Sequence, residues 1–148
     1  MEINGLPLHP LVVHAAVVFG PLAAVAAILY AVLPGWRDRL RWPMLALVLV
    51  ATAAIWTAYY TGVSFRSSRD FFNQPPLAAR IDKHAHLARI LRWVTTGLAL
   101  VAVLAAWMHA RAGAVRVVLS AGLVVAGLAT LVYVVLTGDA GARSVWGQ

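Results

Sequence analysis

The chain has 148 residues, of which 62% are hydrophobic and 11% are charged, and its mean hydropathy is +0.82. A soluble domain is about half apolar and about a quarter charged, so this composition excludes a water-soluble globule. Disorder is also excluded, because it requires low hydrophobicity. The formal charge of +7 would suggest nucleic acid for a soluble protein, but here the basic residues lie between apolar segments and are interpreted as membrane anchors. No nucleic-acid partner is expected.

Four apolar segments are long enough to cross about 30 Å of hydrocarbon as helices. In chain order they span residues 11–33, 44–63, 90–108 and 117–136, and a polar segment over residues 66–89 separates the two pairs. Because Pro75-Pro76 is a helix-start signal, the third helix is expected to begin at Leu77, before its apolar part. The sequence predicts an all-α protein with a single domain over residues 1–148. This domain is an integral membrane four-helix bundle in contact with the lipid bilayer.

The two predicted hairpins resemble each other in their polar residues, which indicates a repeat. The first opens with His9 and His14, and the second opens with His84 and His86. Because the first and third spans start on the same face of the membrane, these four histidines are expected near one boundary. The second and fourth spans end in similar pairs, Thr61-Gly62 and Thr137-Gly138, whose glycines are interpreted as left-handed helix caps.

One interpretation of the histidines is ligation of b-type haem, in which two helices each send a neutral imidazole to the iron. His14 and His86 are the predicted pair, because they come from different hairpins and similar depths. On a helix, His84 and His86 point about 200° apart, and Asp82 at i−4 is placed to accept the second ring proton of His86. The further cofactor-binding candidates are His9 and His84 as secondary ligands, and Arg89 and Arg92 as partners of the haem propionates.

A second interpretation is a site for a divalent metal ion such as zinc, copper or iron, because imidazole is a good ligand for each. Three or four of the following residues would bind it: His9, His14, His84, His86 and Asp82. Proton handling, and histidines that only bond loop carbonyls and headgroups, stay open as alternatives. So does a non-catalytic accessory subunit of a larger membrane complex. The chain shows no phosphate loop or nucleophile with a base, so an enzyme acting alone is not favoured.

The basic residues give the expected orientation. The two short connections contain Arg37, Arg39, Arg41, Arg111 and Arg116, with Asp38 as their acid. The opposite side has as many basic residues, but they lie in longer segments with more acids. No basic region precedes the first span, which is also longer than a signal-peptide core. The sequence therefore predicts a multi-pass protein of the bacterial inner membrane with both termini outside.

Three segments together resemble a known family: Leu8-His9-Pro10-Leu11-Val12-Val13-His14, His84-Ala85-His86 and Thr137-Gly138-Asp139-Ala140-Gly141. They are similar to a family of small bacterial four-helix membrane proteins, the domain of unknown function twenty-two thirty-one. The resemblance covers nearly the whole chain and implies the four-helix fold. Because related domains occur fused to Rieske-type iron–sulfur domains, it also implies a link to membrane electron transfer and a redox or respiratory partner. It leaves homo-oligomerisation open.

Overall fold

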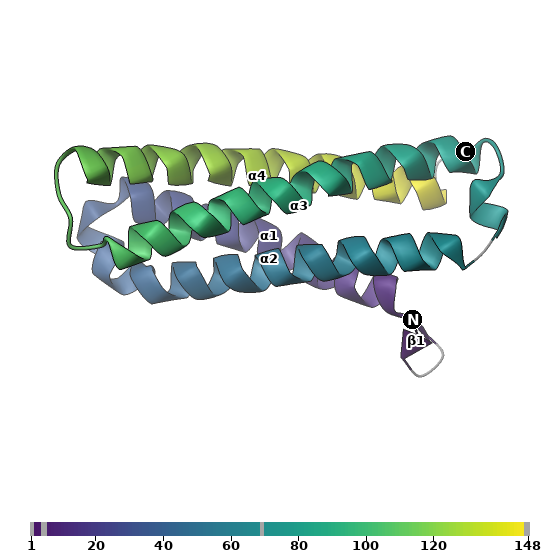
Figure 1. Cartoon of the computed structure of the whole chain (residues 1–148), viewed down its shortest axis with the longest axis horizontal. Coiled ribbons are helices and arrows are strands. Elements are labelled where there is room, and N and C mark those ends of the chain that lie inside the picture. Colours follow the sequence, from purple (N-terminus) through teal and green to yellow (C-terminus); the bar gives the residue numbers. More distant parts are fainter. Residues whose placement is uncertain (1, 4–5, 69, 147–148) are drawn as a thin grey trace.

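The computed structural model describes residues 2–3, 6–68 and 70–146, which form a bundle of long helices (Figure 1). The helices are α1 (Leu8–Val32), α2 (Arg37–Ser67), α3 (Leu77–Trp107) and α4 (Ala114–Trp146). Short 3-10 turns, η1 (Pro34–Trp36) and η2 (Asp70–Asn73), follow α1 and α2, and strands β1 (Glu2–Ile3) and β2 (Leu6–Pro7) pair before α1. Residues 1, 4–5, 69 and 147–148 of the expected domain lie outside the described residues.

All four helices are long and apolar enough to cross a membrane, with mean hydropathies of 1.6 to 2.3 over their most apolar windows. The prediction of an all-α four-helix membrane bundle is therefore confirmed, as is the start of α3 at Leu77. Each helix extends beyond the predicted apolar span at one or both ends. The prediction of caps at Gly62 and Gly138 is wrong, because α2 and α4 continue past these glycines to Ser67 and Trp146.

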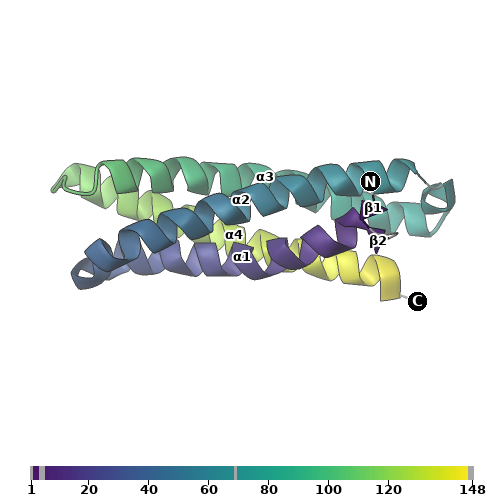
Figure 2. The ribbon, with the colours of Figure 1, turned by 90° about the horizontal axis from the view of Figure 1, so that it is seen from below.

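The four helices surround a common axis. Helix α1 packs against α2 and α4, and α3 packs against the same two helices, so α1 and α3 are diagonally opposite. Figures 1 and 2 show the short connections over residues 33–36 and 108–113 together at one end of the bundle, here called the turn end. Both termini and η2 lie at the other end, here called the terminal end. The hairpin of α1 and α2 and the hairpin of α3 and α4 are therefore parallel to each other.

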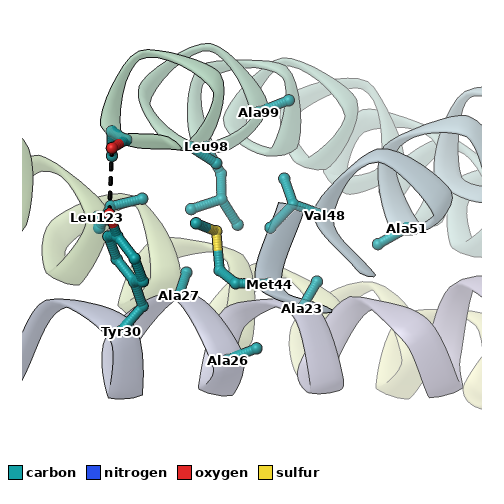
Figure 3. Close-up of a cluster of buried hydrophobic side chains, with 12 residues drawn as sticks. Ala23, Ala26, Ala27, Tyr30, Met44, Val48, Ala51, Leu98, Ala99 and Leu123 are labelled. Carbon is teal, nitrogen blue, oxygen red and sulfur yellow. Dashed lines mark hydrogen bonds between the residues drawn. The ribbon is translucent and has the colours of Figure 1, made fainter. Parts of the chain in front are cut away.

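The core nearest the turn end is filled by one large side chain from each helix. Tyr30, Met44, Leu98 and Leu123 are each no more than 1% exposed, and Figure 3 shows them pointing toward the space between the helices. Alanines fill most of the remaining core positions and allow the helices to approach closely. Lipid is as apolar as the core, so the hydrophobic effect does not drive these helices together. Close packing of small against large side chains stabilises the bundle instead.

Candidate functional site

At the terminal end, His9 starts the inward-facing side of α1. It is half-buried and is followed at spacings of four, three and four residues by Val13, Ala16 and the buried Gly20. Side chains three or four residues apart share one face of a helix. Helix α3 repeats these spacings on its inner side. The corresponding residues are His84, Ala88, Leu91 and Thr95.

Each of these histidines bonds to the second helix of its own hairpin. His9 Nδ1 lies 3.0 Å from the carbonyl oxygen of Ala58 on α2, and His84 Nδ1 lies 3.0 Å from the carbonyl oxygen of Thr137 on α4. A carbonyl oxygen only accepts, so Nδ1 donates in both rings and Nε2 of the neutral imidazole keeps its lone pair. Among the described residues, Nε2 of neither ring makes a hydrogen bond. This bonding orients metal-binding histidines in other proteins.

The two rings are neighbours across the diagonal of the bundle. Their centroids are 6.5 Å apart, and their planes are inclined at 70°. Each ring packs against a glycine of the partner helix. A Cβ atom at Gly62 would lie 2.9 Å from Cε1 of His9, and one at Gly141 would lie 3.1 Å from Cε1 and Nδ1 of His84. Both glycines therefore make room for an imidazole.

A cavity of about 180 Å³ lies beside the two rings. Its lining includes Val13, Ala16, Ile55, Leu91 and Val134, which make most of its wall apolar. The polar side chains in the lining are those of His9, His84, Tyr59 and Thr137. Among the described residues, no carboxylate or arginine lines the cavity, so the titratable side chains in its wall are two imidazoles and a phenol.

The structure does not place the predicted pair, His14 and His86, at this cavity. Both are exposed, and Nδ1 of His14 lies 2.6 Å from the carbonyl oxygen of Pro10 one turn earlier in α1. The prediction that His84 and His86 cannot both face inward holds, but the choice of His86 as the inward residue is wrong. His84 lies on the same side as Ala88 and Leu91, about 200° around the helix from His86.

Asp82 is also away from the expected site. Its carboxylate accepts a hydrogen bond from the guanidinium of Arg66 on α2, and its side chain is 63% exposed. Within the ranges that the structure describes, no three histidine or acidic residues lie close enough together to hold a metal ion. The three- or four-ligand set expected from His9, His14, His84, His86 and Asp82 is therefore not assembled, and only His9 and His84 meet.

The two predicted propionate partners have other surroundings. Arg89 is exposed on α3. The guanidinium carbon of Arg92 lies 4.0 Å from the ring centroid of Tyr59, 4.8 Å from that of Trp56 and 5.3 Å from that of Trp93. A cation enclosed by aromatic faces is stabilised by their quadrupoles, most strongly where water is excluded. Sequence reasoning missed this cluster, because its members come from two helices.

The side-chain contacts confirm the repeat but change its register. His84 follows His9 by 75 positions, whereas Thr137 follows Ala58, and Gly141 follows Gly62, by 79 positions. The expected pairing of Gly62 with Gly138 is therefore wrong by three residues. Gly138 has open space where its Cβ would lie, whereas Gly141 contacts the ring. The correct register pairs Gly62 with Gly141, because each of these glycines contacts the imidazole of its own hairpin.

His109, to which the sequence assigned no site, is held at the turn end by both ring nitrogens. Nδ1 lies 2.9 Å from the hydroxyl of Tyr30, and Nε2 lies 2.6 Å from a carboxylate oxygen of Asp38. The Tyr30 hydroxyl donates to the carbonyl oxygen of Ala105 at 3.1 Å, the bond drawn in Figure 3. With both nitrogens engaged, His109 joins α1, α2 and the end of α3 rather than offering a ligand position.

The comparisons with known proteins agree with the fold. The model of the family DUF2231, described as a predicted membrane protein, matches residues 5–148. The chain belongs to the DUF2231 family. No curated protein and no solved structure matches it. Membership in DUF2231 confirms the family resemblance and, with the four apolar helices, a multi-pass membrane location.

The donor set and the size of the cavity test which group fits the site of this DUF2231 chain. Two imidazoles fixed through Nδ1 suit both a metal ion and the axial positions of haem. The cavity of about 180 Å³ is smaller than the roughly 300–1,000 Å³ of pockets for drug-sized ligands, and a porphyrin is at least as large as such ligands. A cavity of this volume has room for a metal ion with small additional ligands, whereas a porphyrin would require the helices to move apart.

Proposed function

We propose that this protein binds one transition-metal ion of the zinc or copper class between His9 and His84 at the terminal end of its membrane bundle. The observation that supports this most directly is the matched pair of imidazoles beside one cavity. In each, Nδ1 is bonded to a backbone carbonyl, and Nε2 makes no hydrogen bond to the residues that the structure describes. Imidazole suits zinc, copper and iron, and copper binds most tightly of the divalent first-row series.

The ring separation is compatible with joint ligation. With metal–nitrogen bonds of about 2.0–2.1 Å and ring nitrogens about 1.2 Å from the ring centre, two imidazoles on one ion have centroids at most about 6.5 Å apart. The centroids of His9 and His84 are 6.5 Å apart. Because this is the upper limit, the two rings could share an ion as they stand only in a nearly linear arrangement, and a tetrahedral ion would require the rings to move closer together.

The experiment is a metal count on purified protein. After chelator treatment in detergent, the protein is incubated with Cu²⁺ or Zn²⁺, desalted and analysed for bound metal. We expect one ion per chain in the wild type and none in His9→Ala or His84→Ala. The matched controls are His14→Ala and His86→Ala, which remove exposed imidazoles and should retain the ion. Equal binding by all four variants, or loss only in the two controls, would overturn the proposal.

Haem b, with a role in membrane electron transfer, is the second candidate function. The same fixed imidazoles on diagonal helices favour it, although His9 and His84 replace the predicted His14 and His86 as the axial pair. A reduced-minus-oxidised spectrum of the untreated protein tests it. A Soret and an alpha band that disappear in His9→Ala and His84→Ala would establish haem and refute the metal-ion proposal. Absence of both bands, with no haem extracted, would refute haem.

We also propose that the protein lies in the bacterial inner membrane with both termini outside. Both short connections, with their arginines, lie together at the turn end, and both termini lie at the other end (Figure 1). The positive-inside rule then places the turn end in the cytoplasm. Since the chain contains no cysteine, single cysteines at Gly35 and Gln74 report sidedness directly. A membrane-impermeant thiol reagent should label Gln74→Cys in intact spheroplasts and leave Gly35→Cys unlabelled; the reverse pattern would invert the orientation.

A further inference from the structure

An open groove runs along the outside of the bundle at the turn end, between the end of α1 and the start of α4. Its volume is about 520 Å³. Among the described residues, its lining contains one charged side chain, Arg116, and one hydroxyl, Ser120; the other members are Ala31, Val32, Val117, Ala121, Val124 and Val125. Val117 and Val125 are 66% and 68% exposed, so the groove opens outward, toward lipid, rather than into the bundle.

The groove is about as long as one leaflet of a bilayer is thick. Arg116 directly precedes the predicted apolar span, which starts at Val117, so it lies at the membrane boundary. From Arg116 to Val125, helix α4 rises about 14 Å. Half of the hydrocarbon thickness is about 15 Å. The groove therefore begins at the level of the headgroups and ends near the middle of the bilayer, as an acyl chain of that leaflet does.

The arginines of the turn end have no acidic partner among the residues that the structure describes. They are Arg37, Arg39, Arg41, Arg111 and Arg116. Asp38, the acidic residue of this end, lies 2.6 Å from Nε2 of His109 instead. At the terminal end, by contrast, the guanidinium of Arg143 is bonded to the carboxylate of Asp139. The excess positive charge at the turn end therefore needs an anion from outside the chain.

The side chain of Arg116 is fixed at the boundary end of the groove. Its Nε donates to the carbonyl oxygen of Arg111, in the connection before α4, at 3.2 Å. Its two Nη nitrogens make no hydrogen bond to the described residues, and the residue is exposed. A guanidinium with free Nη donors matches the oxygens of a phosphate. The groove thus combines a phosphate-binding group at the headgroup level with an apolar surface in the hydrocarbon.

We infer that one anionic phospholipid of the leaflet at the turn end binds in this groove. Its phosphate lies on the guanidinium of Arg116, and one acyl chain lies along Val117, Ala121 and Val125. A zwitterionic lipid has the same phosphate but also a cationic group, which the neighbouring arginines repel, so the groove selects an anionic headgroup. The lipid site lies at the opposite end of the bundle from His9 and His84 and does not involve the proposed metal ion.

The experiment is native mass spectrometry of the full chain in delipidated micelles, titrated with phosphatidylglycerol or with phosphatidylcholine of the same acyl chains. We expect the wild type to retain one phosphatidylglycerol per chain and to bind phosphatidylcholine more weakly. Arg116→Gln should bind phosphatidylglycerol about tenfold more weakly, the effect of one lost charge-assisted hydrogen bond. Arg116→Lys keeps the charge and should lose less. Ala121→Phe fills the groove and should weaken binding of both lipids.

Two matched controls change the same chemistry elsewhere. Arg143→Gln removes a charge at the other end of α4, where the side chain is 74% exposed, and Ala53→Phe adds a ring at an exposed position of α2. Both should bind phosphatidylglycerol like the wild type. Equal binding of the two lipids by the wild type, or unchanged affinity in Arg116→Gln, would overturn the inference. A loss in Arg116→Gln without a loss in Ala121→Phe would mean that a phosphate binds without an acyl chain in the groove, and would overturn the lipid assignment.

Discussion

The two ends of the bundle contain buried or half-buried histidines that are bonded in different ways. At the terminal end, His9 and His84 each use one ring nitrogen on a backbone carbonyl, and the other nitrogen makes no hydrogen bond to any residue that the structure describes. At the turn end, His109 uses both nitrogens, on Tyr30 and on Asp38. An imidazole with both nitrogens bonded to protein joins helices, whereas one with a lone pair facing a cavity can bind a ligand. The number of engaged nitrogens is therefore the difference on which the proposed metal site depends.

The packing around these histidines also differs between the two ends. Near the turn end, Tyr30, Met44, Leu98 and Leu123 fill the space between the helices. At the terminal end, the side chains of Ile55, Leu91 and Val134 border the cavity beside the two imidazoles. We therefore expect substitutions at the turn end to change mainly the free energy of unfolding, and substitutions at the terminal end to change mainly the proposed metal binding.

The largest expected effect comes from truncating the same residue type in two core clusters, at Leu98 and at Leu91, which lie seven residues apart on α3. Leu98→Ala should lower the free energy of unfolding by about 3 kcal/mol, because it opens a hole in a filled core. Leu91→Ala should cost at least about 1 kcal/mol less, because Leu91 already borders the cavity. Reversible unfolding in mixed micelles, followed by circular dichroism, measures both. Equal losses would show that the terminal end is packed as tightly as the turn end.

The next effect isolates the hydrogen bonds at the turn end. Tyr30→Phe should lower the free energy of unfolding by about 2 kcal/mol, because it leaves a buried ring nitrogen of His109 without its partner. Metal binding at the other end should be unchanged. Tyr60→Phe is the control, since Tyr60 is 58% exposed and its variant should unfold like the wild type. A Tyr30→Phe protein of full stability would mean that this hydroxyl does not join the helices.

Substituting the glycines that contact the imidazoles should have the opposite effect to Tyr30→Phe. It should change metal affinity more than the free energy of unfolding. Gly62→Ala or Gly141→Ala would push a ring aside and should weaken metal binding about tenfold, or about 1.4 kcal/mol. Alanine is the better helix former, so the free energy of unfolding should change by less than about 1 kcal/mol. Gly97→Ala, whose Cβ meets nothing within 4 Å, is the control for a titration with Zn²⁺. Unchanged affinity in both glycine variants would place the metal elsewhere.

Most of the fold was predictable from the sequence, because hydrocarbon thickness sets the length of an apolar segment. The four spans and the start of α3 at Leu77 followed from apolar runs and from Pro75-Pro76. The extension of α2 and α4 past Gly62 and Gly138 did not, because hydropathy reports only the part of a helix that lies in lipid. A glycine inside such an extension has the same local pattern as a helix cap.

The candidate site was predicted only in part. The histidines could be placed at one end because the first and third spans start on the same face of the membrane. The choice of His14 and His86 rested on their coming from different hairpins and lying at similar depths. In a membrane helix both faces are apolar, so the usual polar and apolar sides do not reveal which face is buried. The spacing from His84 through Ala88 and Leu91 was visible in the sequence, yet only packing shows that this side faces inward.

The smallest expected effect tests whether charge or hydrogen bonding holds His109. The Asp38 side chain is 94% exposed and that of His109 is 17% exposed, so Asp38→Asn should lower the free energy of unfolding by only about 0.5 kcal/mol, as for an exposed ion pair. The amide oxygen of asparagine can still accept from Nε2, so the Tyr30 bond should survive. Added salt should narrow the gap between variant and wild type, because it screens the exposed carboxylate. Unfolding at low and high salt measures this. A loss as large as that of Tyr30→Phe, insensitive to salt, would show that the carboxylate positions the ring and that the turn end depends on its charged pair.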